Sequence, residues 1–565
     1  RGFSSETEDV QATENTDVLI TKLKSDDHAN TLIVSSIQKM SNITEEGGMK
    51  AHDLKMMNNK RMVFIIDEAH RSTFGEMLID IKKTFSSALF FGFTGTPIYD
   101  ENQKKLNTTS TVFGDELHRY TIADGIRDKN VLGFDPYKVL THKDSDLRKA
   151  VALEKAKATD EAEALSDPEK KEVFNHYIRN VKMAGCFNAA GEYEKGIEDF
   201  LPLNQFDRKQ HHEKVVKDIK DNWITLSQNN MFHGLFATNS IFDAITYYRL
   251  IKKEMPDLKI SALFDPNIDN NGGHTYKQDG LVEIMTDYND KYKQDFKLAS
   301  HSQFKKDIAS RLAHKAPYIN ITQEDQIDLL IVVDQMLTGF DSKWLNTLYL
   351  DKKMKYESII QSFSRTNRLF GPDKPFGTIR YYRWPHTMER NINDAVKLYS
   401  GDRPIGLFAE QLDHNLKSMN SIFEEISRIF KDSGIINFEK LPTETTSKRK
   451  FAELFKDFNN YLEAAKIQGF IWSKSEYNFG ENPNKYVVKL VIDENTYLIL
   501  AIRYKELFSS TNGGGGVTGV PFEIEGHLTE IDTGRIDNDF MNSKFDKYLK
   551  ELNGNATEIE IKKNL

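Results

Sequence analysis

The chain contains a single cysteine, Cys186, among 565 residues. One thiol excludes an intrachain disulfide and a cysteine-rich zinc site, and such low cysteine usage fits a reducing cytoplasm. We assign Cys186 no role. The sequence also has no apolar stretch approaching the roughly 18 residues that a membrane span needs, so we expect no membrane partner.

An excess of positive charge is also absent, since the formal net charge is −9. The average composition therefore does not indicate nucleic acid, although a local basic groove would still be compatible with it. Charged residues make up 28% and hydrophobic residues 39%, which is typical of a soluble globular protein rather than a disordered one. At about 150 residues per domain, the length predicts roughly three domains.

The first residues lack both an initiator methionine and the basic-then-apolar pattern of a secretion signal. We therefore expect the sequence to be a piece of a longer protein.

Strand-like apolar runs alternate with helix-like stretches through the first 400 residues, which predicts an α/β fold with parallel sheets covered on both faces. The first segment has predicted strands at residues 31–34, 62–66 and 88–93 and a helix at 74–85, so part of one sheet is present. The second segment has a predicted helix at 212–223 and strands at 234–237, 328–333, 347–350 and 378–382.

Residues 145–200 form a polar, charge-dense insertion that we interpret as solvated helix without chemistry of its own. After Pro404 apolar residues recur at helical spacing, which predicts a mainly helical last part with a flexible loop at the four glycines 513–516. We divide the chain into three domains: residues 1–125, 126–400 and 401–565.

The acidic motif Asp67-Glu68-Ala69-His70 follows the apolar run at residues 62–66. Such a run predicts a buried parallel strand, and it places two carboxylates at the carboxyl end of the sheet, where open α/β sheets bind ligands. In P-loop nucleotide hydrolases an acidic residue at this point holds Mg²⁺, and a neighbouring glutamate could orient water. A solvated turn is the alternative for the acidic pair, and a structural role is the alternative for His70.

Two further loops follow predicted strands. Thr94-Gly95-Thr96-Pro97 carries small hydroxyl side chains that can link a nucleotide site to a neighbouring domain. In the second segment, Thr338-Gly339-Phe340-Asp341 combines a glycine that permits close backbone approach with a carboxylate. Asp341 could accept from a ribose hydroxyl or position an arginine, or it could be an ordinary helix-capping or turn residue.

Gln361, Arg365 and Arg368 lie within the run Gln361-Ser362-Phe363-Ser364-Arg365-Thr366-Asn367-Arg368. Two arginines three apart on a helix project from the same face. A planar guanidinium suits a transferring phosphoryl group, and such arginines contribute about 10³–10⁵ in rate in GTPases. A solvated or salt-bridged arginine pair is the alternative.

These motifs, in this order, resemble those of superfamily 2 helicases and translocases, and more narrowly the restriction (motor, R) subunit of type I restriction-modification enzymes. The resemblance rests on residues 35–40 (SSIQKM), 67–72 (DEAHRS), 93–98 (FTGTPI), 336–343 (MLTGFDSK) and 361–368 (QSFSRTNR), with a helical region around residues 522–549. It implies two RecA-like parallel-sheet lobes, the first incomplete, followed by a mainly helical C-terminal domain.

The resemblance also implies roles for the motif residues, with ATP and Mg²⁺ as cofactors. Asp67 would hold Mg²⁺ and Glu68 would activate water, while Gln361, Arg365 and Arg368 would reach the phosphates from the second lobe. Thr94 and Thr96 would couple the state of ATP to the grip on DNA. Backbone contacts with DNA are expected of Ser36, Gln38, Lys39 and Thr338.

The sequence departs from the family pattern in two places. Ser364 stands where the family usually has glycine, a small change that leaves the arginines usable. More seriously, no G-x-x-x-x-G-K-[ST] phosphate loop occurs in the sequence. Around Asp493, Arg503 stands where an acidic metal ligand of a nuclease belongs. We therefore expect both the phosphate loop and the nuclease residues to be missing, and this chain alone to be inactive.

The resemblance implies a cytoplasmic motor that couples ATP hydrolysis to double-stranded DNA translocation, in a complex with methyltransferase and specificity subunits, before cleavage by a separate nuclease domain. Two alternatives remain. The chain could be a non-hydrolysing module that docks on a methyltransferase partner, or another superfamily 2 enzyme such as a type III restriction subunit or a repair helicase.

Overall fold

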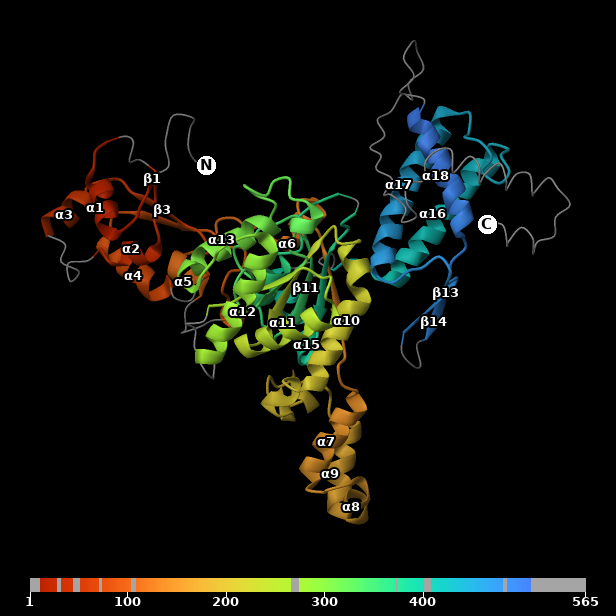
Figure 1. Cartoon of the computed structure of the whole chain (residues 1–565), viewed down its shortest axis with the longest axis horizontal. Coiled ribbons are helices and arrows are strands. Elements are labelled where there is room, and N and C mark those ends of the chain that lie inside the picture. Colours follow the sequence, from red (N-terminus) through yellow and green to blue (C-terminus); the bar gives the residue numbers. More distant parts are fainter. Residues whose placement is uncertain are drawn as a thin grey trace, which may run out of the picture. The chain divides into compact units, whose positions relative to one another are not determined.

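A computed structural model of the chain divides it into two compact units, residues 1–368 with 377–408 and residues 369–376 with 409–565 (Figure 1). The structure describes residues 11–27, 32–43, 51–70, 74–102, 108–265, 274–371, 373–400, 408–480 and 485–509. The predicted loop at 513–516 and the helical region around 522–549 lie outside these residues. Among the described residues, no helix is both long and apolar enough to cross a bilayer.

The first lobe, which we define as β1 to α6, holds two short parallel strand pairs, β1 with β2 and β3 with β4. Its elements are β1 (Gln11–Ala12), α1 (Thr16–Lys24), β2 (Ile33–Val34), α2 (Ile37–Ser41), α3 (Ala51–Asn58), β3 (Val63–Ile66), α4 (Phe74–Thr84), β4 (Leu89–Gly92), α5 (Thr109–Phe113) and α6 (Ile122–Arg127).

The inner face of the β3–β4 pair packs on the helices of this lobe. The Phe64 and Phe90 rings stack with their centroids 4.7 Å apart, and both belong to an apolar cluster with residues of α1 to α4. On the other face, alternate side chains such as Val63 and Ile65 are more than half exposed. The predicted burial of this strand on both faces is therefore wrong, because the described helices cover one face of the pair only.

The second lobe, which we define as β5 to α15, is built on a six-stranded, fully parallel sheet in the order β5-β12-β11-β8-β10-β9. Its strands are β5 (Phe134–Lys138), β8 (His233–Thr238), β9 (Ile260–Leu263), β10 (Leu329–Val332), β11 (Leu345–Asp351) and β12 (Gly377–Tyr381). Its helices include α10 (Lys209–Ser227), α11 (Ile241–Glu254), α12 (His274–Tyr292), α13 (His301–Leu312), α14 (Glu357–Phe363) and α15 (Pro385–Tyr399), several of which surround β11 in Figure 1. Every residue of β8, β10, β11 and β12 is buried, so both faces of this sheet are covered as predicted.

The polar insertion between β5 and α10 is helical in its first part and then forms a small hairpin. It comprises α7 (Asp144–Ala156), α8 (Glu161–Ser166), α9 (Pro168–Arg179) and the antiparallel pair β6 (Cys186–Phe187) and β7 (Tyr193–Glu194). The segment that follows the hairpin is tied to the sheet by Arg383, whose guanidinium donates to Asp207 and to Asp351 at the end of β11. Burial alone would raise the pKa of Asp351, but His211 and Arg383 hold that pKa below its usual range.

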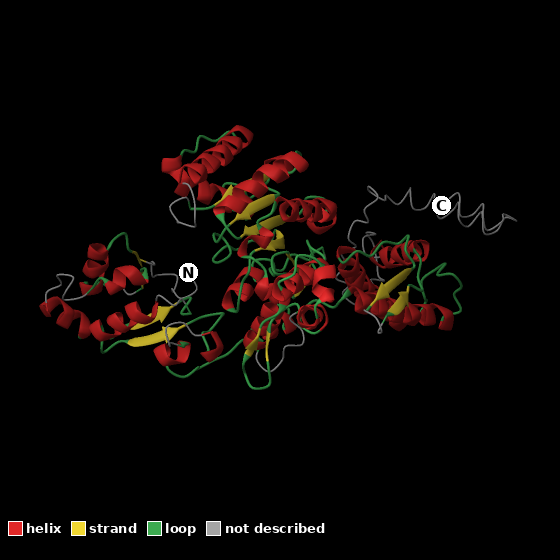
Figure 2. Cartoon of the chain, turned by 90° about the horizontal axis from the view of Figure 1, so that it is seen from below, coloured by secondary structure: helices red, strands yellow, loops and turns green. Residues whose placement is uncertain are grey.

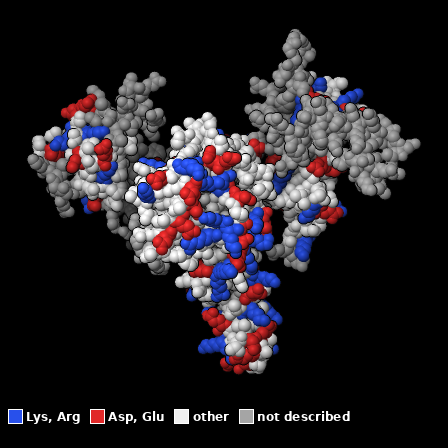
Figure 3. All heavy atoms as spheres, in the orientation of Figure 1, with Lys and Arg blue, Asp and Glu red and all other residues white. Residues whose placement is uncertain are grey.

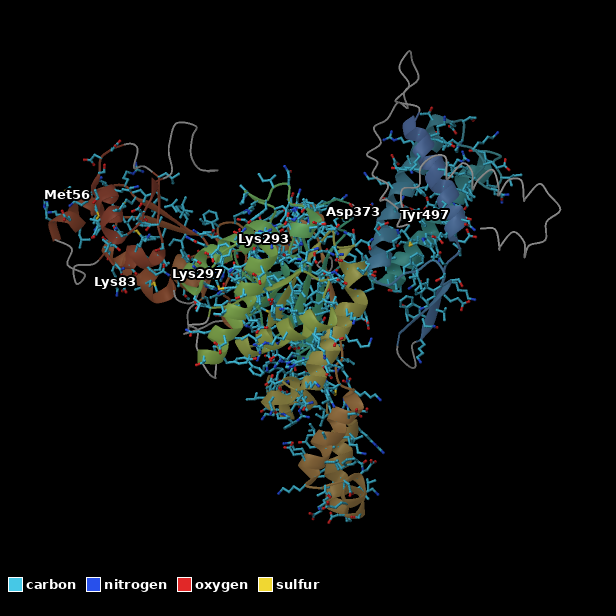
Figure 4. The ribbon with its side chains drawn as sticks, viewed as in Figure 1. Met56, Lys83, Lys293, Lys297, Asp373 and Tyr497 are labelled. Atoms are coloured by element: carbon cyan, nitrogen blue, oxygen red, sulfur yellow. The ribbon has the colours of Figure 1, made fainter. Side chains whose placement is uncertain are left out.

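The described part of the C-terminal unit packs three helices and one hairpin around an aromatic core. The elements are α16 (Leu412–Asp432), α17 (Thr445–Ile467), β13 (Glu476–Phe479), β14 (Tyr486–Lys489) and α18 (Glu494–Ser509). Tyr497, labelled in Figure 4, packs its ring against Phe455, Phe458 and Trp472. The prediction of a mainly helical region is confirmed, whereas the antiparallel pair β13–β14, drawn in yellow in Figure 2, was not predicted.

Together the parallel sheets and the mainly helical last part confirm the predicted α/β fold class, with the first lobe incomplete among the described residues.

Candidate functional site

The acidic motif lies at the carboxyl end of β3, and the Thr94 loop lies beside it at the end of β4. Because these strands are parallel and in register, both motifs lie at the carboxyl end of the sheet. The Ala69 amide donates to the Phe93 carbonyl at 3.0 Å, and the Phe93 amide donates to the Ile66 carbonyl at 2.8 Å. The two loops are therefore joined by backbone hydrogen bonds. Asp67 and Glu68 themselves are exposed.

Glu68 adopts a left-handed backbone conformation, with φ +52°. Its amide donates to Asp67 Oδ1 at 2.9 Å. A non-glycine residue in this region costs free energy and is held there by its surroundings, a situation that is frequent at ligand-binding sites. The turn presents both carboxylates at the sheet edge, and an exposed carboxylate such as Asp67 supplies the hard oxygen ligand that Mg²⁺ prefers.

His70 links the acidic motif to the Thr94 loop. It is buried, with Nδ1 2.8 Å from Thr94 Oγ1 and 3.2 Å from Glu68 Oε2. Thr94 Oγ1 also accepts from the Thr96 amide at 3.1 Å. The imidazole therefore has the hydrogen-bonded position of a relay between the two loops.

Gln361 brings α14 of the second lobe to this site. Its Nε2 lies 2.7 Å from His70 Nε2 and donates to Thr96 Oγ1 at 2.8 Å. An amide nitrogen only donates, so in this arrangement His70 Nε2 accepts and the imidazole proton lies on Nδ1, directed at Thr94 and Glu68. Three motifs from distant parts of the sequence therefore form one hydrogen-bonded chain.

The two arginines lie beyond the helix that carries Gln361. We predicted both on one helix face, and this is wrong, because α14 ends at Phe363. The Ser364 hydroxyl donates to the Ile360 carbonyl and the Thr366 hydroxyl to the Phe363 carbonyl, at 2.7 and 2.9 Å. These side chains satisfy the last carbonyls of the helix and terminate it, as short hydroxyl residues commonly do.

Arg365 is partly buried, and its guanidinium is anchored by neutral oxygens. Its Nε donates to the Gln361 carbonyl at 3.0 Å, and another guanidinium nitrogen donates to the Phe340 carbonyl. Burial and the nearby Arg368 lower the pKa of Arg365, while Asp341 and Glu68 act in the opposite direction. Glu68 of the first lobe thus lies within electrostatic range of Arg365, whose hydrogen bonds go to neutral carbonyls.

Asp341 pairs with Arg368, whose Nε donates to Asp341 Oδ1 at 2.6 Å. Of the roles considered for Asp341, the structure thus shows a contact with an arginine. Gly339 has φ +75°, a conformation that glycine adopts at little cost, and Thr338 beside it is exposed.

The residues expected to touch DNA in the first lobe lie around the short helix α2. Ser36 is its N-cap, accepting weakly from the Lys39 amide at 3.5 Å, and Gln38 is exposed. The Lys39 ammonium donates to the Thr13 carbonyl at 2.5 Å. The structure gives Ser36 and Lys39 local structural roles, and their contact with DNA stays a prediction.

Sequence reasoning missed a second link between the lobes. Asn102 is buried and donates through Nδ2 to Tyr399 Oη at 2.8 Å and to Glu357 Oε2 at 3.3 Å. The Tyr399 hydroxyl donates to the Pro97 carbonyl at 3.1 Å. These residues flank the Thr94 loop and α14, but no local pattern distinguishes a contact between residues 297 positions apart.

A glutamine of one parallel-sheet lobe contacts the loops that follow the strands of the other, the arrangement expected of a helicase-type ATPase. Comparison with known families agrees. The SWI2/SNF2 ATPase family matches residues 1–171, type I restriction enzyme subunit R domain 3 matches residues 230–384, and the C-terminal region of subunit R of type I restriction and modification enzymes matches residues 407–565.

Individual proteins show the same relationship. The endonuclease subunit of a type I restriction enzyme from Staphylococcus aureus is 35% identical over 401 residues, which cover 69% of this chain and 37% of that protein. A subunit of the same kind from Methanocaldococcus jannaschii is 25% identical over 478 residues, covering 81% of this chain and 39% of that one. A solved fragment of an HsdR subunit from Vibrio vulnificus is 14% identical, covering 61% of this chain and 46% of that chain with a TM-score of 0.33.

The predicted resemblance to the R subunit of type I restriction enzymes is therefore confirmed. The chain is R subunit-like and carries an SNF2-like ATPase region. It spans a little over a third of the length of the curated relatives that it matches.

Proposed function

We propose that this chain is the motor part of a type I restriction enzyme, in which ATP hydrolysis drives movement along double-stranded DNA. The observation that carries the proposal is the contact of Gln361, on the second lobe, with His70 and Thr96 on the first. Together with the electrostatic interaction between Glu68 and Arg365, it supports one site between the lobes for the acidic motif and Arg365. The R subunit relatives, named as endonuclease subunits, support the assignment to restriction.

Each side chain has a role that follows from its position. Asp67 would hold Mg²⁺, which neutralises phosphate charge when bound; one carboxylate suffices because Mg²⁺ takes its other ligands from phosphates and water. Glu68 would orient the attacking water. Arg365 would stabilise the γ-phosphate, since an anion would supply the compensation that its surroundings lack. Arg368 would exchange Asp341 for a phosphate oxygen.

Coupling to DNA would follow the hydrogen-bonded chain between the lobes. Loss of the γ-phosphate would release Arg365, and Gln361 lies in the same loop-and-helix segment, so its contacts with His70 and Thr96 would change with the nucleotide. We assign Thr94 and Thr96 to transmitting this change to the residues that grip DNA, among them Ser36, Gln38, Lys39 and Thr338. DNA affinity would fall steeply with salt because phosphate contacts dominate such grips.

In this proposal the phosphate loop and the nuclease domain belong to a longer polypeptide, and methyltransferase and specificity subunits supply the recognised site. The setting would be cytoplasmic, as the single cysteine suggests. Three matches to type I or SWI2/SNF2 families favour this reading over a type III restriction subunit.

ATP turnover of the longer polypeptide, with and without duplex DNA, tests the proposal. We expect DNA-stimulated hydrolysis that Arg365→Ala lowers by at least about 10³-fold, in the range of arginines that contact a transferring phosphoryl group. Arg249→Ala is the matched control, because Arg249 is an exposed arginine of the second lobe paired with Glu283. Unchanged hydrolysis by the Arg365 variant would refute the site assignment. Absence of turnover in the intact polypeptide would instead favour a non-hydrolysing docking module.

A further inference from the structure

A pocket of about 400 Å³ lies in the second lobe, between the hairpin β6–β7 of the insertion and the segment that leads from β11 into α14. Its third wall is α15. The lining residues are Phe187, Tyr193, Asp199, Lys353, Lys355, Tyr356, Thr387, Arg390, Asn391 and Asp394. None of them belongs to the candidate ATP site, and the volume lies within the range of small-ligand sites.

The hairpin contributes two aromatic rings. Phe187 and Tyr193 pair edge to face with centroids 5.3 Å apart, and Phe187 is 70% exposed. Tyr193 is held in place, because its hydroxyl donates to Asp199 Oδ2 at 2.9 Å and packs closely on Gly185, where a Cβ would lie 2.4 Å from that hydroxyl. A largely exposed aromatic ring such as that of Phe187 offers a surface on which a nucleic-acid base can stack.

The opposite wall carries three cationic side chains, Lys353, Lys355 and Arg390, together with the carboxylate of Asp394 on α15. Lys353 and Lys355 are exposed on either side of Met354, which is buried and whose carbonyl accepts from Asn391 Nδ2 at 2.7 Å. Within the described parts of the chain, neither lysine forms an ion pair, and the Lys353 ammonium lies 5.0 Å from the centroid of the Trp384 ring. Arg390 donates to neutral oxygens of Gly185, Tyr193 and Asn391, and its guanidinium lies 5.6 Å from the centroid of the Tyr193 ring.

A buried hydroxyl in the pocket wall also lacks a partner. Thr387 is 4% exposed, and its Oγ1 makes no hydrogen bond to any described residue. Burying a hydroxyl without a partner costs free energy, and such a group calls for an explanation. This oxygen is closed off from solvent, so a ligand atom in the pocket would reach it only after the Thr387 side chain rotates.

We propose that this pocket binds a single nucleotide unit, with its base stacked on Phe187 and Tyr193 and its phosphate held by Lys353, Lys355 and Arg390. Aromatic rings with cationic side chains are the combination by which proteins hold unpaired nucleotides. The volume admits one nucleotide and excludes a duplex. Two sources share this chemistry, a free nucleotide and an unpaired position in a DNA strand.

The pocket is also placed to influence the candidate ATP site. Tyr356 lines it and directly precedes α14, the helix that carries Gln361. Tyr356 has φ +44° and ψ −118°, a strained conformation for a residue with a side chain. A ligand that shifts Tyr356 would therefore move the helix whose glutamine contacts His70.

Direct binding tests the proposal without requiring hydrolysis, so its outcome is separate from that of the motor function. Fluorescently labelled ADP and a labelled single-stranded oligo(dT) are titrated with the chain. Phe187→Ala and Lys355→Glu should each weaken binding of at least one probe about fivefold or more, since a base–aromatic stack contributes about 1–3 kcal/mol. Phe187→Trp should retain binding. If the Phe187 and Lys355 variants bind ADP more weakly, the ligand is a free nucleotide. If they bind oligo(dT) more weakly, the ligand is an unpaired position in a DNA strand.

Three controls make the result decisive. Lys297→Glu changes an exposed lysine elsewhere in the second lobe (Figure 4) and should leave binding unchanged. Leu203→Ala removes an exposed apolar side chain outside the pocket and should also have no effect. Arg365→Ala alters the candidate ATP site but not the pocket, so it shows at which of the two sites a probe binds. If neither probe binds, or if binding depends on Arg365 but not on Phe187 and Lys355, the pocket assignment is wrong, and in the latter case the candidate ATP site gains support.

Discussion

Gln361 connects the lobes through its carboxamide alone, and it does so at a histidine rather than at a charged group. Its side-chain Nε2 contacts both His70 and Thr96, while its backbone carbonyl accepts a hydrogen bond from Arg365 Nε. Its position in the motif predicted that it belongs to the site, because it stands four residues before Arg365. Its partners were not predictable, because no property of a single sequence specifies which residue a carboxamide meets across two lobes.

This geometry leads to a prediction for the motor activity of the longer polypeptide. Gln361→Ala removes the contacts to His70 and Thr96 but leaves the carboxylates and guanidinium groups in place. We therefore expect DNA to lose most of its stimulation of ATP turnover, while turnover without DNA falls by no more than about tenfold, because the loss of one hydrogen-bonding partner costs about 0.5–1.5 kcal/mol. The ratio of turnover with and without DNA measures the effect.

The matched control is Gln323→Ala, at an exposed glutamine of the same unit. A Gln361 variant that is stimulated by DNA as strongly as the unmodified protein would show that this contact does not couple the lobes.

At the scale of elements, strands that are buried on both faces of the sheet were the most predictable from sequence. The second-lobe strands β8, β10, β11 and β12 appeared in the sequence as apolar runs, and all four were predicted. The edge strand β5 was missed because it contains Pro136 and polar residues, which edge positions tolerate. The hairpin β13–β14 was missed because four-residue strands give little periodic signal within a helical region.

Acidic and basic side chains of the second lobe are mixed rather than gathered into patches of one sign on the face shown in Figure 3. This pattern explains why the net charge of −9 did not indicate nucleic acid. A grip on DNA by this face would depend on a few positioned cations rather than on a general basic surface.

A pair of histidines gives the second lobe a predicted pH dependence. His233 begins β8, and its Nε2 lies 2.9 Å from Nε2 of His314, whose ring stacks on Trp344. Burial lowers the pKa of His233 to about 3, with help from His314 and Lys259, and burial and Lys343 lower the pKa of His314 to about 4. Both imidazoles are neutral in the folded chain at neutral pH, whereas the unfolded chain binds protons below about pH 6.5.

Stability should therefore be fully present above about pH 6.5 and decrease as the pH falls toward 4, by up to about 1.4 kcal/mol per pH unit for each histidine. Urea unfolding between pH 4.5 and 8 measures this dependence. His314→Asn keeps a residue that tolerates the left-handed backbone at this position and removes one titrating group, so the dependence should become shallower. Equal slopes for the two proteins below pH 6.5 would contradict the assignment, and measurements near pH 8 serve as the internal control.

At the scale of the whole molecule, the chain is a two-unit protein that spans a little over a third of its curated relatives. The exposed face of β3 and the lack of a phosphate loop in the sequence are both understandable if further residues complete the first lobe. The central claim is that Glu68 of one lobe and Arg365 of the other act on the same triphosphate.

A double-mutant cycle on DNA-stimulated ATP hydrolysis by the longer polypeptide tests that claim most directly. If both residues act on one transition state, Glu68→Gln should lower kcat by at least about 10²-fold and Arg365→Ala by at least about 10³-fold. The double variant should fall only about threefold below the slower single variant, because groups that act as a unit are non-additive. If the two effects instead multiply fully, or if either single variant retains the unmodified rate, the two side chains do not serve one site.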